Sequence, residues 1–199
     1  CVFSEEIRNE GMMSASMVQY VCEAYDYTKL GFAYNGSALA LNSFLYSGYM
    51  WQRVREQGGA YGFNIAISDD GVLDISSYRD PKLAETLAVY RGIGEYLCDV
   101  KISDSDVTNS IISAISSLDT PLMPHSAGVL AFANRISGKT IGQKQRERDE
   151  LIASTAEDMR AFAPLFDAVT AKGCICVYGN EEKLRANADL FKSLVAVDG

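Results

Sequence analysis

An alternating run of side chains over residues 60–68 sets the first limit on how this chain can fold. One face of the run carries Tyr61, Phe63, Ile65 and Ile67. Period-two alternation of this kind is typical of a strand that is buried on one face. Residues 69–71, Asp-Asp-Gly, are a hairpin-turn sequence, and residues 72–79 resume a strand-like pattern. The sequence therefore predicts an antiparallel hairpin.

A long helix is predicted immediately before this hairpin, over about residues 37–57. Apolar residues and one glycine recur at helical spacing along a single stripe, which we expect to be buried: Leu41, Phe44, Leu45, Gly48 and Trp51. Gly48 on this stripe would let another backbone approach closely. Gly58 is expected to end the helix with a positive φ. Arg55 lies in the last turn, where a cation suits the negative end of the helix dipole.

The remaining pattern predicts an α+β fold. Further strands are expected over residues 17–27 and 173–179, and further helices over 81–100, 103–118, 126–137, 142–154 and 181–195. Ser103 is a predicted N-cap, and Thr155 with Asp158 resembles a capping box. Residues 1–16 show no clear period and are interpreted as a linking segment from a preceding domain, which leaves residues 17–199 as one domain. Strands and helices are partly segregated, which favours a largely antiparallel sheet with helices packed on one face.

Composition and charge narrow the range of partners. The chain has 199 residues, a formal net charge of -8 and a pI of about 4.7, whereas nucleic-acid binding requires a basic surface. Since no apolar run approaches the roughly 20 residues that cross a bilayer, no membrane association is predicted. The chain begins "CVFSEE" without Met, which fits a piece of a longer or processed protein. The absence of a visible export signal favours the bacterial cytoplasm or the mitochondrial matrix.

Cysteine and histidine usage argues against a metal site in this chain. The cysteines are Cys1, Cys22, Cys98, Cys174 and Cys176, and they include no C-x-x-C pair. Cys174 and Cys176 alternate on a predicted strand, so they should share a face and pack as small, reduced core groups. The single histidine, His125, has no ligand spacing around it and is predicted to lie at a cap or on the surface.

Arg55 and Tyr61 form the candidate functional pair. The sequence contains no H-x-x-E-H, G-x-S-x-G or G-x-x-x-x-G-K motif, and "GGAYG" precedes a strand instead of opening a helix as a phosphate loop does. A guanidinium and a phenol can both donate hydrogen bonds to a carbonyl oxygen or to an oxyanion. Gly58 and Gly59 would bring the backbone close to a ligand. The alternative is structural: Arg55 would satisfy helix-end carbonyls, and Tyr61 would join the core.

Two linked motifs resemble a known family. "YMWQRVREQGGAYGF" and "SYRDPKLAETLAVYRGIGEYL" are similar to the last domain of pitrilysin/insulinase-family zinc metallopeptidases of the presequence-protease and falcilysin branch. In that branch R-x-x-G-G-A-Y-G follows a long helix, and S-Y-R-D-P-x-L opens the next helix after a hairpin. The weaker pattern covers most of the chain, from about Gln19 to residues 173–179.

This resemblance implies a chamber built from four homologous α+β domains that close around a peptide substrate. The first domain would hold zinc through H-x-x-E-H and a distal glutamate, so the zinc ligands would lie in N-terminal domains of the same polypeptide and none in this chain. The last domain would contribute an arginine and a tyrosine to catalysis, which match Arg55 and Tyr61. The isolated chain is expected to be inactive.

A second interpretation is a structural one. The same family includes members without zinc sites that act as assembly subunits, so this chain could belong to a catalytically inactive structural subunit. An H-x-x-E-H motif upstream in the coding sequence would distinguish the enzyme from the scaffold.

Overall fold

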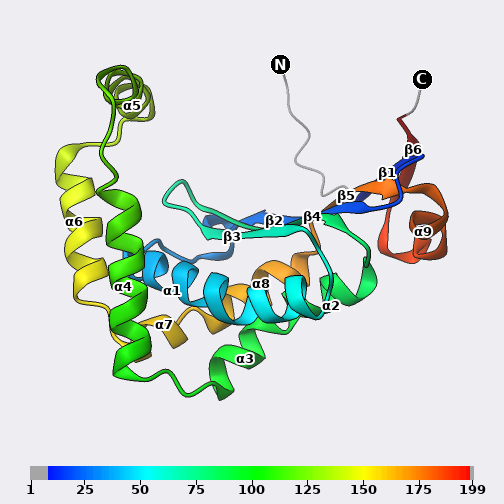
Figure 1. Ribbon diagram of the computed structural model, residues 1–199, viewed down its shortest axis with the longest axis horizontal. Coiled ribbons are helices and arrows are strands. Elements are labelled where there is room, and N and C mark those ends of the chain that lie inside the picture. The colour runs from blue at the N-terminus through cyan, green and yellow to red at the C-terminus, as the bar shows by residue number, and fades with distance from the viewer. Residues whose placement is uncertain (1–8, 198–199) are drawn as a thin grey trace.

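A six-stranded sheet forms the centre of the fold (Figure 1), and the computed structural model describes residues 9–197. In chain order its strands are β1 (Glu10–Ser14), β2 (Gln19–Asp26), β3 (Gly62–Ile67), β4 (Val72–Asp80), β5 (Ile175–Asn180) and β6 (Ser193–Ala196). Their spatial order is β3-β4-β2-β5-β1-β6. The predicted hairpin is confirmed as β3 and β4, and two further predicted strands are confirmed as β2 and β5.

The sheet combines two kinds of pairing. β3 with β4, β4 with β2, and β2 with β5 are antiparallel, whereas β1 pairs in parallel with both β5 and β6. β5 and β6 lie on either side of β1, and the crossover connection between these parallel strands contains α9 (Glu181–Ala186) and the short helix η3 (Ala188–Leu190). The predicted α+β class with largely antiparallel pairing is confirmed, with a parallel edge at β1 and β6.

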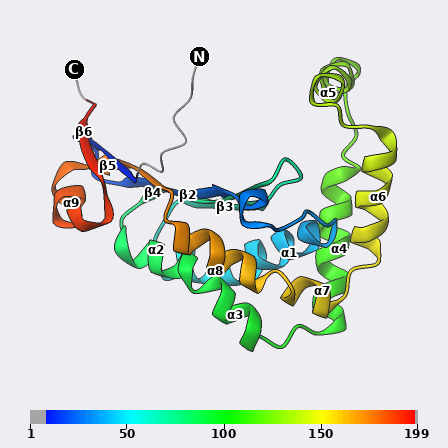
Figure 2. The same ribbon diagram turned by 180° about the vertical axis from the view of Figure 1, so that it is seen from behind.

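Helices cover only one face of the sheet, as the two opposite views show (Figures 1 and 2). The helices in contact with strands include α1 (Ser37–Leu45), η2 (Tyr46–Glu56), α2 (Ala84–Arg91), α8 (Ala163–Lys172) and α9. Two shorter helices, α3 (Ile93–Asp99) and α7 (Ala156–Arg160), lie farther from the sheet, and η1 (Tyr27–Leu30) follows β2. Within residues 9–197 no helix lies over the opposite face, which we call the open face.

An arm of three helices stands at the turn of the β3–β4 hairpin (Figure 1). It consists of α4 (Asp104–Leu118), α5 (Pro124–Ser137) and α6 (Ile141–Ile152). Ser103 caps α4 in a capping box with Asp106, and Thr155 caps α7 in a box with Asp158, so both predicted caps are confirmed. His125 lies exposed in the first turn of α5, as predicted. No helix in the described part of the chain is both long and apolar enough to cross a bilayer.

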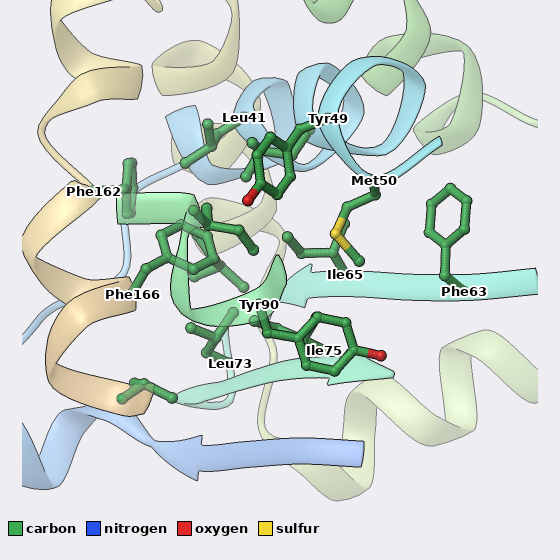
Figure 3. Close-up of a cluster of buried hydrophobic side chains, with 14 of the residues drawn as sticks. Leu41, Tyr49, Met50, Phe63, Ile65, Leu73, Ile75, Tyr90, Phe162 and Phe166 are labelled. Atoms are coloured by element: carbon green, nitrogen blue, oxygen red, sulfur yellow. The ribbon is translucent and has the colours of Figure 1, made fainter. Parts of the chain in front are cut away.

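The core fills the space between the sheet and the helices (Figure 3). Leu41 and Met50 point from the helical layer toward Ile65, Leu73 and Ile75 of the hairpin, and all five are at most 4% exposed. Phe166 of α8 and Tyr90 of α2 complete this cluster. Burial of this apolar surface is the main term that holds the helices against the sheet.

Several element predictions were wrong, both near the ends of the chain and within it. Residues 10–14 of the predicted linking segment are β1, an internal strand of the sheet, while residues 1–8 lie outside the described residues. The predicted helix over residues 181–195 is instead α9, η3 and β6. The predicted helix over 81–100 begins only at Ala84 and is interrupted at Gly92, and α8 was not predicted at all.

The cysteines were also misplaced. Cys174 and Cys176 do share one side of the chain, but that side is the open face. Cys176 is exposed there and is the register partner of Cys22 in the neighbouring strand; both thiols are free, so these side chains are not part of the core. Cys98 is exposed as well, and Cys1 lies outside the described residues. Burial, reinforced by Asp74, raises the pKa of the Cys22 thiol to about 12 and keeps it protonated.

Candidate functional site

The helix that carries Arg55 changes its winding halfway along. Residues 37–45 are α-helical, and residues 46–56 form a π-helix, η2. Hydrogen bonds in a π-helix run from i to i+5, which shifts the buried stripe away from the 3.6-residue period. Tyr49, Met50 and Val54 are therefore buried, whereas Gly48 and Trp51 are exposed.

Gly48 and Trp51 lie on the exposed side of η2. Gly48 and Trp51 were wrongly assigned to the buried stripe, and a Cβ at Gly48 would meet no atom within 4 Å, so no backbone packs against it. Trp51 is instead 40% exposed and donates a hydrogen bond from Nε1 to Glu56 Oε1 at 3.1 Å. The π-helix thus places Trp51 and Arg55 together on its exposed side.

The glycine turn brings Tyr61 back toward the helix end. Gly59, not Gly58, has the positive φ, at 85°, which corrects the prediction for Gly58. Gly58 is needed for a steric reason, because a Cβ there would lie 2.2 Å from the carbonyl oxygen of Val54. The turn is closed by hydrogen bonds from Gly59 N to Arg55 O at 2.9 Å and from Ala60 N to Val54 O at 3.2 Å. Each glycine therefore supports the turn in its own way.

Arg55 and Tyr61 lie in direct contact on the surface. Arg55 Nη1 donates a hydrogen bond to the carbonyl oxygen of Tyr61. The Arg55 guanidinium also lies over the Trp51 ring, 4.8 Å from its centroid, and 5.8 Å from the Tyr61 centroid. Tyr61 is 57% exposed, so it is not part of the core. Its hydroxyl makes no hydrogen bond within the described part of the chain, and four of the five Arg55 N–H groups are not used in this contact.

A third residue, Arg79, joins this pair and was missed by the sequence analysis. The β2–β4 register shifts between Gln19 and Val21, so Tyr78 and Arg79 both lie opposite the single residue Tyr20. Arg79 is the one non-glycine residue with a positive φ, 49°, among residues 9–197. A bulge of this kind re-aims a side chain, and the Arg79 guanidinium lies 5.4 Å from the Tyr61 ring centroid. The "SYRDP" motif contains Arg79, but the alternation of a regular strand without a bulge would not direct its side chain toward Tyr61.

No metal site was found near this cluster. Within residues 9–197 no group of three or more His, Cys, Asp or Glu side chains is arranged to hold a metal ion. The four hollows identified on the described surface also lie elsewhere, at the α5–α6 arm, beside Phe32 and Phe162, and beneath η2. Arg55 and Tyr61 thus form an exposed group of hydrogen-bond donors outside these four hollows.

Comparison with known proteins assigns the chain to a family. The family described as the PreP C-terminal domain matches residues 9–180. The chain belongs to this family of presequence-protease C-terminal domains. Among curated proteins, it is 37% identical over 190 residues to Protein HypA of Clostridium perfringens, covering 96% of this chain and 20% of that protein. It is 32% identical over 181 residues to Presequence protease 1, chloroplastic/mitochondrial, of Arabidopsis thaliana, covering 90% of this chain and 17% of that protein.

Solved structures agree on the fold. The inactive peptidase domain of a putative zinc protease from Bordetella parapertussis has a TM-score of 0.60 and 16% identity, covering 83% of this chain and 91% of that chain. A peptidase M16 inactive domain from Pseudomonas fluorescens has a TM-score of 0.57 and 14% identity, and the match covers 86% of this chain and 42% of that chain. At these identities the likeness shows the fold alone. This PreP C-terminal domain spans about a fifth of the length of the curated relatives that it matches.

Proposed function

We propose that this PreP C-terminal domain is the non-metal-binding last domain of a zinc metalloendopeptidase, which degrades unstructured peptides inside a closed chamber. The family assignment and the presequence proteases among its relatives support a peptidase. The partners of the domain are then the N-terminal, zinc-binding domains of the same polypeptide and a peptide substrate. The parent protein works in the bacterial cytoplasm or in the mitochondrial matrix.

Arg55 and Tyr61 donate hydrogen bonds to the substrate carbonyl group in this proposal. Their direct contact on an exposed surface is the observation that carries it: the Arg55 guanidinium is anchored by the Tyr61 carbonyl and the Trp51 ring, and it keeps further N–H groups for a ligand. Donors that are fixed in advance stabilise developing negative charge with little reorganisation. Gly58 and Gly59 hold the turn and let a peptide backbone come close to it.

Zinc does not fit residues 9–197, since this part of the domain offers no set of metal ligands. We therefore place the zinc ligands in the N-terminal domains, and this domain supplies donors and substrate contacts only. The chain alone should be inactive toward peptides.

The test compares variants of the whole parent polypeptide on an unstructured peptide. Tyr61→Phe removes only the hydroxyl, and Arg55→Ala removes the guanidinium; each should lower kcat about 10²–10³-fold, the usual effect of losing one oxyanion donor. Arg53→Ala is the matched control, because Arg53 is an exposed arginine two residues away whose guanidinium lies over Tyr49 instead. Unchanged turnover in both Tyr61→Phe and Arg55→Ala would refute these roles.

The structural-subunit alternative predicts a different result. If the parent polypeptide lacks an upstream H-x-x-E-H motif and hydrolyses no peptide, the domain is part of a scaffold, and Arg55 and Tyr61 variants should alter assembly only.

A further inference from the structure

A row of tyrosines extends from the candidate site across the open face of the sheet. The Tyr61 ring contacts Tyr78 of β4 at a centroid distance of 5.6 Å, Tyr78 lies 6.5 Å from Tyr20 of β2, and Tyr20 lies 5.9 Å from Tyr178 of β5. We call these four residues the tyrosine row. Because β3, β4, β2 and β5 are consecutive in the sheet, the row runs across the strands. Tyr61, Tyr78, Tyr20 and Tyr178 are 57%, 42%, 42% and 39% exposed, respectively.

The sheet holds these rings in place. Tyr20 and Tyr178 are register partners, and Tyr78 is the register partner of Gly62. A Cβ at Gly62 would lie 2.2 Å from the Tyr78 ring, so only glycine lets this ring lie over β3. No hydroxyl of the row makes a hydrogen bond within residues 9–197, which leaves both ring faces and hydroxyls open to a ligand.

Arginines lie at the Tyr61 end of the row, and acidic residues lie at the other open-face positions. Within the six strands, the charged residues at open-face positions are Glu10, Asp26 and Asp74. The one basic residue of the strands is Arg79, which lies at the bulge beside Tyr61. Asp74 lies four residues along β4 from Tyr78, and Asp26 lies at the far end of β2 from Tyr20. Away from its Tyr61 end, the open face therefore carries exposed aromatic rings and, farther along the strands, carboxylates, and both attract lysine and arginine side chains.

We infer that the tyrosine row is a second peptide-binding site, which takes an extended segment with basic and apolar side chains as it leaves the Arg55–Tyr61 cluster. This inference rests on the proposed peptidase function for its ligand class. In an extended peptide, side chains on the same face recur about every 6.6 Å, close to the ring spacings of 5.6–6.5 Å along the row. A segment of about six residues would cover it. Long peptides would thus bind more tightly than short ones.

Peptide binding to the whole parent polypeptide, measured by fluorescence anisotropy with a metal chelator present to prevent cleavage, tests this site. The probe is a labelled, unstructured peptide of about 15 residues that contains lysine, arginine and leucine. The double variant Tyr20→Ser/Tyr178→Ser should raise Kd about tenfold, whereas Tyr20→Phe/Tyr178→Phe should stay within about twofold, because the rings are kept. Tyr46→Ser is the control, since Tyr46 is 46% exposed but lies on η2, on the helix-covered side.

Two further measurements distinguish peptide binding at the tyrosine row from binding at the Arg55–Tyr61 cluster or contact with another domain. A peptide of about four residues should reach only the Arg55–Tyr61 cluster and lose no affinity in the double serine variant. Asp74→Asn should weaken binding of the basic probe and leave a glutamate-containing probe unaffected, which tests the charge without removing a ring. Wild-type affinity in the double serine variant would overturn the inference. So would a lower melting temperature of the parent polypeptide in that variant without any loss of affinity, since another domain would then cover the row.

The outcome is independent of the catalytic proposal. If Arg55→Ala and Tyr61→Phe leave turnover unchanged but the double serine variant loses affinity, the peptide site stands and the donor roles fail. If Arg55→Ala and Tyr61→Phe lower turnover but the double serine variant keeps wild-type affinity, the donor roles stand and only the peptide site on the tyrosine row is refuted.

Discussion

Glu23 is a buried acid without a partner. It lies on the helix-covered face of β2 at 0% exposure, and neither carboxylate oxygen has a hydrogen-bond partner among the described residues. Burial, offset only in part by Arg91, raises the pKa of the Glu23 carboxyl from 4.5 to about 7. The folded domain therefore holds this proton at pH values where the unfolded chain has released it.

The stability of the domain should fall as the pH rises through this range. Between pH 4.5 and about 7 the native state binds more protons than the unfolded state, so the free energy of unfolding decreases by at most about 1.4 kcal/mol per pH unit. Below that window the contribution is fully present, and above it the contribution is lost. Glu23→Gln should remove this dependence and be more stable than the wild type at pH 8, as measured by urea unfolding from pH 5 to 8.

Glu182→Gln provides the control, because Glu182 is an exposed acid on α9. It should leave the pH dependence unchanged. A wild-type domain with the same free energy of unfolding at pH 5 and pH 8 would contradict the assignment of the proton to Glu23.

Residue identities predicted part of the site. Arg55 and Tyr61 were expected to act together, and the structure does bring them into contact. Arg79 was missed because its position depends on a bulge, and a bulge is set by the pairing of β4 with β2 and not by the local pattern.

The bulge in β4 gives a prediction at the level of one strand. Arg79 has a φ of 49°, which costs a non-glycine residue about 1 kcal/mol. Arg79→Gly should therefore be more stable than Arg79→Ala by about 1 kcal/mol in urea unfolding, although both lose the guanidinium over Tyr61. Ser76, in the regular part of β4, should show the opposite order, with Ser76→Ala more stable than Ser76→Gly. Equal stability of the two Arg79 variants would show that the bulge carries no backbone strain.

Elements with strong local signals were predictable, and elements that depend on distant partners were not. The capping boxes at Ser103 and Thr155 marked real helix starts. β1 and β6 have weak strand patterns, and parallel pairing around β5 decides their conformation. The π-helical winding of η2 moved Gly48 and Trp51 outward, because a 3.6-residue period cannot describe i to i+5 hydrogen bonding. α8 could have been found from Pro164 in its first turn and Gly173 at its end.

At the scale of the whole molecule, the alternation of side chains along each strand predicted two different faces of the sheet. It did not predict which face the helices cover. Cys176 and Tyr178 alternate with buried residues of β5, yet they lie on the open face. Only the connections that place α1, α2 and α8 on one side decide this, and they are long-range. The same arrangement leaves the tyrosine row uncovered and sets the α4–α6 arm beside one end of the sheet (Figure 2).

Charged contacts join this arm to the hairpin, and they give the last prediction. Lys139, at the α5–α6 junction, forms ion pairs with Asp69 of the hairpin turn at 2.6 Å and with Glu147 of α6 at 3.0 Å. Tyr34 donates a further hydrogen bond to Glu147 at 2.7 Å. α5 has no buried residue of its own, so its attachment depends on such contacts.

Lys139→Met keeps an unbranched side chain that is one atom shorter, and it removes the charge. Because partly exposed ion pairs contribute little to global stability, the free energy of unfolding should change by less than about 1 kcal/mol. Hydrogen exchange should nevertheless accelerate in α5 and in the hairpin turn, where local opening no longer breaks an ion pair. Lys144→Met is the matched control, since Lys144 lies on α6 and makes no ion pair within residues 9–197. Unchanged exchange in α5 would mean that the arm is held by contacts other than those of Lys139.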